Sequence, residues 1–205
     1  DIAGYQNWVQ IPLALDPAVV DVGTRQEPAL EVIASLDPDL ILGVSFRHAP
    51  IYDQLSAIAP TLLFDPYTDS MTQYDEMLST FTTIAQAVER EAEGQAVLDA
   101  LNAHFGAAAE ALESAGLAGE TFILSQSFPS GDVPSFRLFT ENALAVQVME
   151  QIGLENAWDD APQQFGFSTV DFEAFASISE TNFLYVAQED YQPVLTSSPL
   201  WNGIP

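Results

Sequence analysis

The chain of 205 residues contains no cysteine and no lysine. Without cysteine it can form neither a disulfide nor a thiolate metal site, and it has no cysteine nucleophile. Its 4 basic residues are all arginines and stand against 30 Asp and Glu residues, so the formal net charge is -26. Because 4 arginines cannot assemble a basic patch, the composition argues against nucleic acid and anionic membrane surfaces as partners.

Long apolar runs are also lacking. No stretch reaches the roughly 18 apolar residues that a membrane-spanning helix needs, although 48% of the residues are hydrophobic and can build a sizeable core. The first residues carry no signal-peptide pattern, and the chain begins without Met. We therefore interpret the sequence as a piece of a longer protein. Its acidity fits either a salty habitat or a genome that favours Arg over Lys.

The motifs of common enzyme classes are absent as well. The sequence has no nucleophile elbow, phosphate-binding glycine loop, His-Glu zinc motif or dinucleotide fingerprint. Its 2 histidines, His48 and His104, lie far apart, and His104 stands in a helical pattern that predicts a solvated position. Asp159 and Asp160 are candidate calcium ligands, but adjacent acids in so acidic a chain are more often surface residues. The sequence favours binding over catalysis.

The order of elements predicts an α/β fold. Residues 28–44 read as a short helix, a proline-marked turn and a buried strand, and helical spacing over 51–58 precedes a second strand at 61–64. Residues 70–115 predict two long helices. A strand at 121–125 follows, and 136–139 leads into a helix over about 141–152. Alternation of helix and strand is typical of parallel sheets.

An internal repeat supports a two-lobed organisation. The segments 31–36 and 40–42 return as 173–178 and 183–186, with one extra residue in the second turn, so that Glu31 corresponds to Glu173. The long helical stretch lies between the two copies. We expect a partial N-terminal lobe at 1–68, a helical region with an interlobe connecting helix at 69–118 and a partial C-terminal lobe at 119–205. Ligands of open α/β sheets bind outside the carboxyl ends of the strands, which predicts a cleft between the lobes.

The arginines are the best candidates for ligand contacts. Arg90 stands among glutamates on a predicted helix and reads as a solvated ion pair. Arg25, Arg47 and Arg137 instead lie at predicted strand ends or lobe rims, Arg47 in the loop Ser45–His48. Each arginine taken alone is as well explained by pairing with one of the many acids. Together they predict a positive cleft that holds a polycarboxylate or another compact anion through bidentate hydrogen bonds.

Five aromatic residues lie in loop-like, polar or glycine-containing surroundings instead of periodic core stretches. They are Tyr5, Trp8, Phe165, Phe167 and Tyr191. Such residues are more often core or rim residues than ligand contacts.

Several blocks of the sequence resemble the iron-siderophore substrate-binding proteins of ABC importers, most of all the ferric citrate and carboxylate-siderophore branch. The blocks are DVGTRQEPALE at 21–31, LDPDLIL at 36–42, SFRH at 45–48, YDQLSAIAPT at 52–61, FRLFT at 136–140, IGL at 152–154 and SPLW at 198–201. They extend over nearly the whole chain, and the first is the most specific.

The resemblance implies a two-lobed periplasmic-binding-protein fold of class III, with parallel-type sheets joined by a long helix and incomplete here at both ends. It implies a monomeric receptor, periplasmic or lipid-anchored outside the cytoplasmic membrane, that captures a ferric siderophore and delivers it to an ABC permease. The implied ligand contacts are Arg25, Arg47, Arg137, Trp8, Phe165 and His48. Iron is held by the siderophore, so no cofactor and no metal-ligating side chain is implied.

The resemblance also implies docking acids on the lobe surfaces. Glu31 and Glu173 match glutamates that contact permease arginines, and Asp53 is a rival docking acid in the first lobe. The alternative is that each is a carboxylate favoured by a helix N-terminus. Receptors for heme, cobalamin or a bare metal share this fold and stay open as alternatives. An enzyme or a purely structural domain is a third class, and an enzyme would have His48 as the one imidazole base in the predicted cleft.

Overall fold

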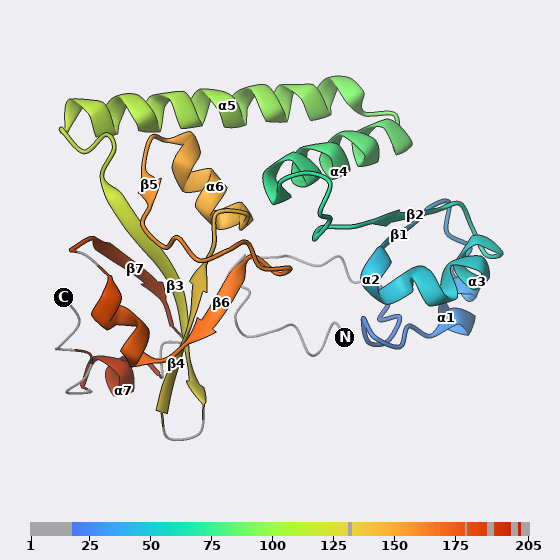
Figure 1. Cartoon of the computed structure of the whole chain (residues 1–205). Coiled ribbons are helices and arrows are strands. Elements are labelled where there is room, and N and C mark those ends of the chain that lie inside the picture. Colours follow the sequence, from blue (N-terminus) through green and yellow to red (C-terminus); the bar gives the residue numbers. More distant parts are fainter. Residues whose placement is uncertain (1–17, 131–132, 179, 188–190, 198–200, 202–205) are drawn as a thin grey trace. The chain divides into compact units, whose positions relative to one another are not determined.

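The computed structural model describes residues 18–201 apart from 131–132, 179, 188–190 and 198–200 (Figure 1). The chain forms two compact units, residues 1–66 and 67–205. In the described part of the chain, no helix is both long and apolar enough to cross a membrane. The expected division at residues 68 and 118, with an interlobe connecting helix, stays a prediction.

The first unit holds a two-stranded parallel sheet with short helices. Its elements are α1 (Leu30–Ser35), β1 (Ile41–Val44), α2 (Ser45–His48), a 3₁₀ turn (Ala49–Ile51), α3 (Tyr52–Ser56) and β2 (Thr61–Phe64). β1 and β2 run parallel in the register Ile41 to Thr61 through Val44 to Phe64. The predicted helix-to-strand unit and the second strand are confirmed. The segment that contains α2 and α3 is the crossover connection that a parallel pair of strands needs.

The segment after β1 differs from its prediction. Ser45–His48 was expected to be a loop, but it forms the helical turn α2, closed by the hydrogen bond from the Ala49 N–H to the Ser45 carbonyl. Pro50, which has no N–H to donate, is the second residue of the 3₁₀ turn that follows. Arg47 and His48 therefore lie in the last turn of a short helix directly beyond the carboxyl end of β1.

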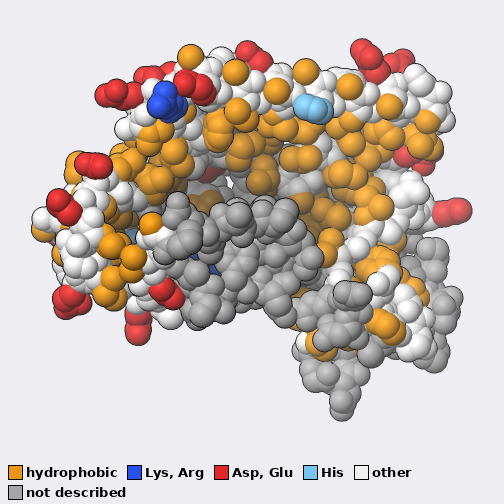
Figure 2. Space-filling view, turned by 180° about the vertical axis from the view of Figure 1, so that it is seen from behind, with side chains coloured by type: hydrophobic (Ala, Val, Ile, Leu, Met, Phe, Trp, Pro, Cys, Tyr) orange, Lys and Arg blue, Asp and Glu red, His pale blue; other side chains and the backbone are white. Residues whose placement is uncertain are grey.

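Two long helices open the second unit, as predicted. α4 (Gln73–Ala87) is capped by Thr72, whose Oγ1 accepts a hydrogen bond from the Asp75 N–H at 3.0 Å. α5 (Glu91–Ser114) follows after a break at Glu89, whose φ of 56° is left-handed. Figure 2 shows acidic side chains along the outer edge over α5, and hydrophobic ones beneath them. This distribution of acidic and hydrophobic side chains is that of an amphipathic helix that packs on one face only.

The sheet of the second unit is mixed, which corrects the prediction of parallel-type sheets. Its strands are β3 (Thr121–Ser130), β4 (Val133–Phe139), β5 (Glu155–Asn156), β6 (Phe167–Val170) and β7 (Asn182–Val186). β3 pairs parallel with β5 and β7, whereas β4 runs antiparallel to both β3 and β6. Only two residues separate β3 from β4, and so short a connection can join only antiparallel strands.

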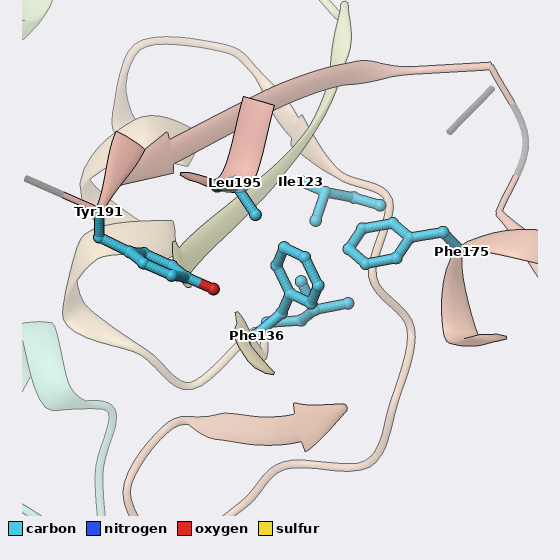
Figure 3. Close-up of a cluster of buried hydrophobic side chains, with 6 residues drawn as sticks. Ile123, Phe136, Phe175, Tyr191 and Leu195 are labelled. Atoms are coloured by element: carbon cyan, nitrogen blue, oxygen red, sulfur yellow. The ribbon is translucent and has the colours of Figure 1, made fainter. Parts of the chain in front are cut away.

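Strand alternation divides the side chains of this sheet between two faces. One face carries a core cluster closed by the 3₁₀ helix Phe172–Ser177 and by α7 (Gln192–Thr196) (Figure 3). Its buried members are Ile123, Phe136, Leu138, Phe175, Tyr191 and Leu195. The other face packs Phe122 against Val146 of α6 (Leu144–Gln151), the helix expected over about 141–152. Arg137 points to the α6 side, because it alternates with Phe136 and Leu138.

The internal repeat corresponds to similar structure in both units. α1 leads into β1, and the 3₁₀ helix Phe172–Ser177 leads into β7. Glu31 and Glu173 each lie in the first turn of the respective helix. The second copy is a 3₁₀ helix capped by Asp171, whose side chain accepts a hydrogen bond from the Glu173 N–H at 2.9 Å.

Candidate ligand-binding site

Arg25 stands in a tight turn ahead of α1. Gly23 and Pro28 form an antiparallel bridge, and Gly23 has φ +96°, a conformation that L side chains rarely adopt. Inside the turn, Thr24 Oγ1 accepts a hydrogen bond from the Glu27 N–H at 3.0 Å. These bonds leave the side chain of Arg25 exposed. The turn therefore presents the guanidinium to solvent from a defined backbone.

His48 joins this turn to the end of β1. Its Nδ1 accepts a hydrogen bond from the Val44 N–H at 3.0 Å, and its Nε2 lies 3.0 Å from the carbonyl oxygen of Arg25. Because Nδ1 must be an acceptor here, the proton of the neutral ring is on Nε2, which donates to Arg25. Both ring nitrogens are thus bonded to backbone groups. The segments that carry Arg25 and Arg47 are brought together by this one side chain.

Arg47 lies beside its neighbour Phe46. The guanidinium carbon is 4.2 Å from the centre of the Phe46 ring, a cation–π contact, and the ring is itself exposed. Arg47 follows β1 directly, at the carboxyl end of the parallel pair of strands. Open α/β sheets bind ligands at that end.

Arg137 is positioned by the register of β4 with its neighbours. It lies opposite Gln126 of β3, and its Nη1 donates a hydrogen bond to Gln126 Oε1 at 3.0 Å. The Phe128 and Phe167 rings lie diagonally on either side, with centres 5.0 and 4.7 Å from the guanidinium carbon. Sequence reasoning missed Gln126 and Phe128, although their spacing of two on one strand places them on one face.

The guanidinium of Arg137 has unused hydrogen-bonding capacity. Its Nε is buried and has no hydrogen-bond partner among the described residues. A buried hydrogen-bond donor without an acceptor costs free energy. Because the two rings hold the guanidinium of Arg137 in place, the unpaired Nε needs an explanation. Gln126 pairs with Val186 of β7 as well as with Arg137, which places this group toward the carboxyl ends of the parallel strands β3 and β7.

Phe165 extends the aromatic surface around Arg137. Its ring is 46% exposed and stacks on Phe167 with centres 6.5 Å apart, while Tyr67 meets it edge-on at 5.0 Å. Gly166 between the two phenylalanines has φ +78°. A Cβ at Gly166 would lie 3.0 Å from Ala143 Cα and 3.0 Å from Gln73 Nε2, so both the conformation and the space at this position favour glycine.

Ion pairing separates the arginines into two groups. In the part of the chain that the structure describes, the one ion pair is Arg90 to Glu93, with Nη1 3.2 Å from Oε1 and both side chains exposed. That confirms the prediction for Arg90. Arg25, Arg47 and Arg137 have no carboxylate partner among the described residues, in a chain with 30 acids. Three unpaired cations are candidates for binding an anion.

The remaining predicted residues take the following places. Glu31, Asp53 and Glu173 are exposed in the first turns of their helices, and His104 is exposed on α5 with Nδ1 2.7 Å from the Ala100 carbonyl oxygen. Trp8 and Tyr5 lie outside the described residues.

That Arg25, Arg47 and Arg137 meet at one ligand stays a prediction. Among the described residues, no three His, Cys, Asp or Glu side chains gather closely enough to hold a metal ion.

Residues 1–205 all match the family model Peripla_BP_2, described as periplasmic binding protein. The chain belongs to this family. Among curated members, it is 30% identical over 186 residues to the Fe(3+)-citrate-binding protein YfmC of Bacillus subtilis (strain 168), covering 89% of this chain and 55% of that protein. It is 44% identical over 78 residues to the Fe(3+) dicitrate-binding periplasmic protein FecB of Escherichia coli (strain K12), covering 38% of this chain and 25% of FecB.

A solved family member has the same fold. The Vibrio cholerae siderophore-binding protein FhuD, solved with Fe3+-Desferal bound, matches with a TM-score of 0.83 and 28% identity, covering 93% of this chain and 71% of FhuD. The expected fold class is thereby confirmed, with the mixed sheet described above. The chain spans between 55% and 67% of the length of the curated relatives that it matches over most of its own length.

Proposed function

We propose that this chain is part of a receptor outside the cytoplasmic membrane that binds a ferric siderophore of the carboxylate type and delivers it to an ABC permease. Arg25, Arg47 and Arg137 bind the anionic groups of the siderophore. The observation that carries the proposal is the lack of any carboxylate partner for these arginines among the described residues of a chain with net charge -26. A focused positive site in a negative protein selects for an anion that the rest of the surface repels.

The surroundings of each arginine support the proposal. Arg137 is held by Gln126 and lies between two phenylalanine rings, so little side-chain entropy is lost when it binds a ligand. Its buried Nε gains the acceptor that it lacks within the described chain. Phe165, with Trp8, is proposed to contact the organic part of the siderophore.

Catalysis is not part of the proposal. His48 was the one imidazole base expected in the predicted cleft, and both of its nitrogens are bonded to backbone groups. A general base needs a free nitrogen within hydrogen-bond reach of the proton that it removes. Iron is proposed to be held by the siderophore itself.

Delivery to a permease is proposed to use the exposed acids Glu31 and Glu173, which occupy equivalent first-turn positions in the two copies of the internal repeat. Asp53, in the first turn of α3, is the rival in the first unit. Exposed acids of this kind contact arginines of a partner, and their loss slows association more than it changes the fold. The receptor is proposed to act as a monomer.

Relatives point to two ligand classes. YfmC and FecB are named for ferric citrate, whereas the FhuD structure holds Fe3+-Desferal, a ferric hydroxamate. We favour the carboxylate class because three guanidinium groups without a carboxylate partner among the described residues match carboxylates bidentately and gain less from a ligand with low charge.

The test is a titration of the intrinsic tryptophan fluorescence with ferric citrate and, separately, with ferric desferrioxamine. Ferric citrate is expected to quench the fluorescence. Arg47→Ala should weaken its binding by about 1.5 to 3 kcal/mol, the usual worth of a hydrogen bond to a charged group, and should change desferrioxamine binding much less. Arg90→Ala, which removes an exposed ion-paired arginine, is the matched control. Quenching by desferrioxamine alone would shift the proposal to hydroxamates, and quenching by no ferric siderophore would refute it.

A further inference from the structure

We propose that His48 is a positioning residue that fixes the turn carrying Arg25, and that it does not contact the ligand itself. The inference rests on the proposed function, since Arg25 is there a ligand contact. His48 was expected from the family resemblance to bind the ligand. The geometry assigns it a different role, because its two nitrogens already bond the Val44 N–H and the Arg25 carbonyl at 3.0 Å each.

Packing around Gly43 supports this assignment independently. A Cβ atom added at Gly43 would lie 2.8 Å from His48 Nδ1 and 2.8 Å from Leu63 Cδ2. No real Cβ approaches so closely, so the imidazole lies against the bare backbone of β1 in space that only glycine leaves. The ring is therefore held by the sheet on one side and holds the Arg25 turn on the other.

The bond to Arg25 spans 23 positions of the chain, and its acceptor is the backbone carbonyl of the residue whose side chain is proposed to bind the ligand. Fixing that carbonyl restricts ψ of Arg25 and the direction in which its side chain leaves the turn. One hydrogen bond, from the Ala29 N–H to the Val22 carbonyl oxygen at 2.7 Å, closes the turn at its base. At the tip, the hydrogen bond between Thr24 and Glu27 is local to the turn, whereas His48 anchors the tip to the end of β1.

Two amide substitutions separate the two bonds of His48. Asn places an acceptor oxygen near the position of Nδ1, so His48→Asn keeps the Val44 bond and loses the one to Arg25. Gln places an amide N–H near the position of Nε2, so His48→Gln keeps the bond to Arg25. If the anchor on Arg25 matters, the Gln variant should retain function and the Asn variant should not.

The first test needs no ligand. Because the 205 residues contain no lysine and only 4 arginines, trypsin reports on each arginine separately, and the bond after Arg25 includes the very carbonyl that His48 holds. Cleavage there, mapped by mass spectrometry, should be about fivefold faster in His48→Asn than in the wild type and near the wild-type rate in His48→Gln. Cleavage after Arg90, in the other unit, is the internal reference.

Loss of stability is controlled with Leu55→Ala, which removes from the core of the same unit a side chain that is only 3% exposed and is no partner in either hydrogen bond of His48. The cleavage rates of Leu55→Ala and His48→Asn are compared under conditions in which both variants have lost the same free energy of unfolding. If Leu55→Ala speeds cleavage after Arg25 as much as His48→Asn does, or if the Asn and Gln variants behave alike, His48 is not a specific anchor and the proposal is overturned.

The second test uses ferric citrate binding. His48→Asn should raise the Kd about fivefold and His48→Gln less than twofold, and both effects should vanish in an Arg25→Gln background, because the anchor then has no ligand contact to position. An effect that persists without Arg25 would contradict the proposal. If the wild type binds no ferric siderophore, the proposed function fails, while the trypsin experiment still decides whether His48 anchors the turn.

Discussion

Gln126 and Arg137 face each other across β3 and β4, and the amide oxygen of Gln126 accepts a hydrogen bond from Arg137 Nη1 at 3.0 Å. A neutral amide holds the guanidinium in place without cancelling its charge. Carboxylates form bidentate hydrogen bonds with arginine and are abundant in this chain. The choice of glutamine leaves the charge of Arg137 available to a ligand.

Gln126→Glu should therefore weaken the binding of ferric citrate. The new carboxylate has the same shape and turns the hydrogen bond into an ion pair, which lowers the attraction of Arg137 for an anion. We expect roughly a tenfold higher Kd, about 1.4 kcal/mol, measured by fluorescence titration, with no loss in melting temperature. Asn102→Asp, an exposed position on α5, adds the same charge away from the site and is the control. Equal losses in both variants would mean that only net charge matters.

Two glycines of α5 should respond to alanine in opposite directions. A Cβ at Gly94 would lie 2.7 Å from the Cβ of Ala85, so α4 and α5 could not keep their spacing. The gain in helix propensity of about 1 kcal/mol is smaller than an overpacking cost of up to about 3 kcal/mol, so Gly94→Ala should destabilise.

At Gly106 no atom lies within 4 Å of the added Cβ. Gly106→Ala gains helix propensity without a steric clash and should stabilise the protein by about 0.5 to 1 kcal/mol. Denaturant unfolding of the two variants checks both signs. Stabilisation by Gly94→Ala would show that the helices do not pack as closely as the structure has them.

Tyr191 buries a hydroxyl without a hydrogen-bond partner among the described residues. The side chain is 8% exposed, its oxygen points into the cluster around Phe136 (Figure 3), and burial raises the pKa of the phenol above its ordinary value of 10.0. Removing an unpaired buried hydroxyl removes its desolvation cost. Tyr191→Phe should thus leave the free energy of unfolding unchanged or increase it by up to about 1 kcal/mol, whereas Tyr191→Ala should lower it by about 3 kcal/mol or more. A clear loss in the Phe variant would reveal a partner for the hydroxyl.

Glu150 at the end of α6 should make stability depend on pH. Partial burial, and then repulsion from Glu141, raise the pKa of its carboxyl above the ordinary value of 4.5. The folded state then holds the proton more tightly than the unfolded state, so the contribution of this group to stability is present below pH 4.5 and is lost as pH rises through the raised pKa.

Glu150→Gln should accordingly raise the melting temperature at pH 7 and leave it unchanged near pH 4. The gain is expected to be small because the side chain is largely exposed. Glu110→Gln, an exposed acid of α5, measures the general benefit of removing one negative charge. A gain at pH 7 no larger than that of Glu110→Gln would contradict the prediction.

Local patterns in the sequence were sufficient for most elements. The strand at 61–64 and the helix-to-strand unit before it follow from short apolar runs bounded by prolines, and the two long helices follow from helical spacing. Helical and strand periodicities are properties of neighbouring residues, so a single chain segment reveals them.

The sequence by itself determined the class of elements, the scarcity of cations and the positions at which they stand along the chain. Only the tertiary structure decided that β4 runs antiparallel, that Gln126, Phe128 and Phe167 surround Arg137, and that His48 bonds the carbonyl of Arg25. These relationships depend on strand register and on contacts between segments distant in sequence. Register is set by the packing of a whole face at once, and no local spacing contains that information.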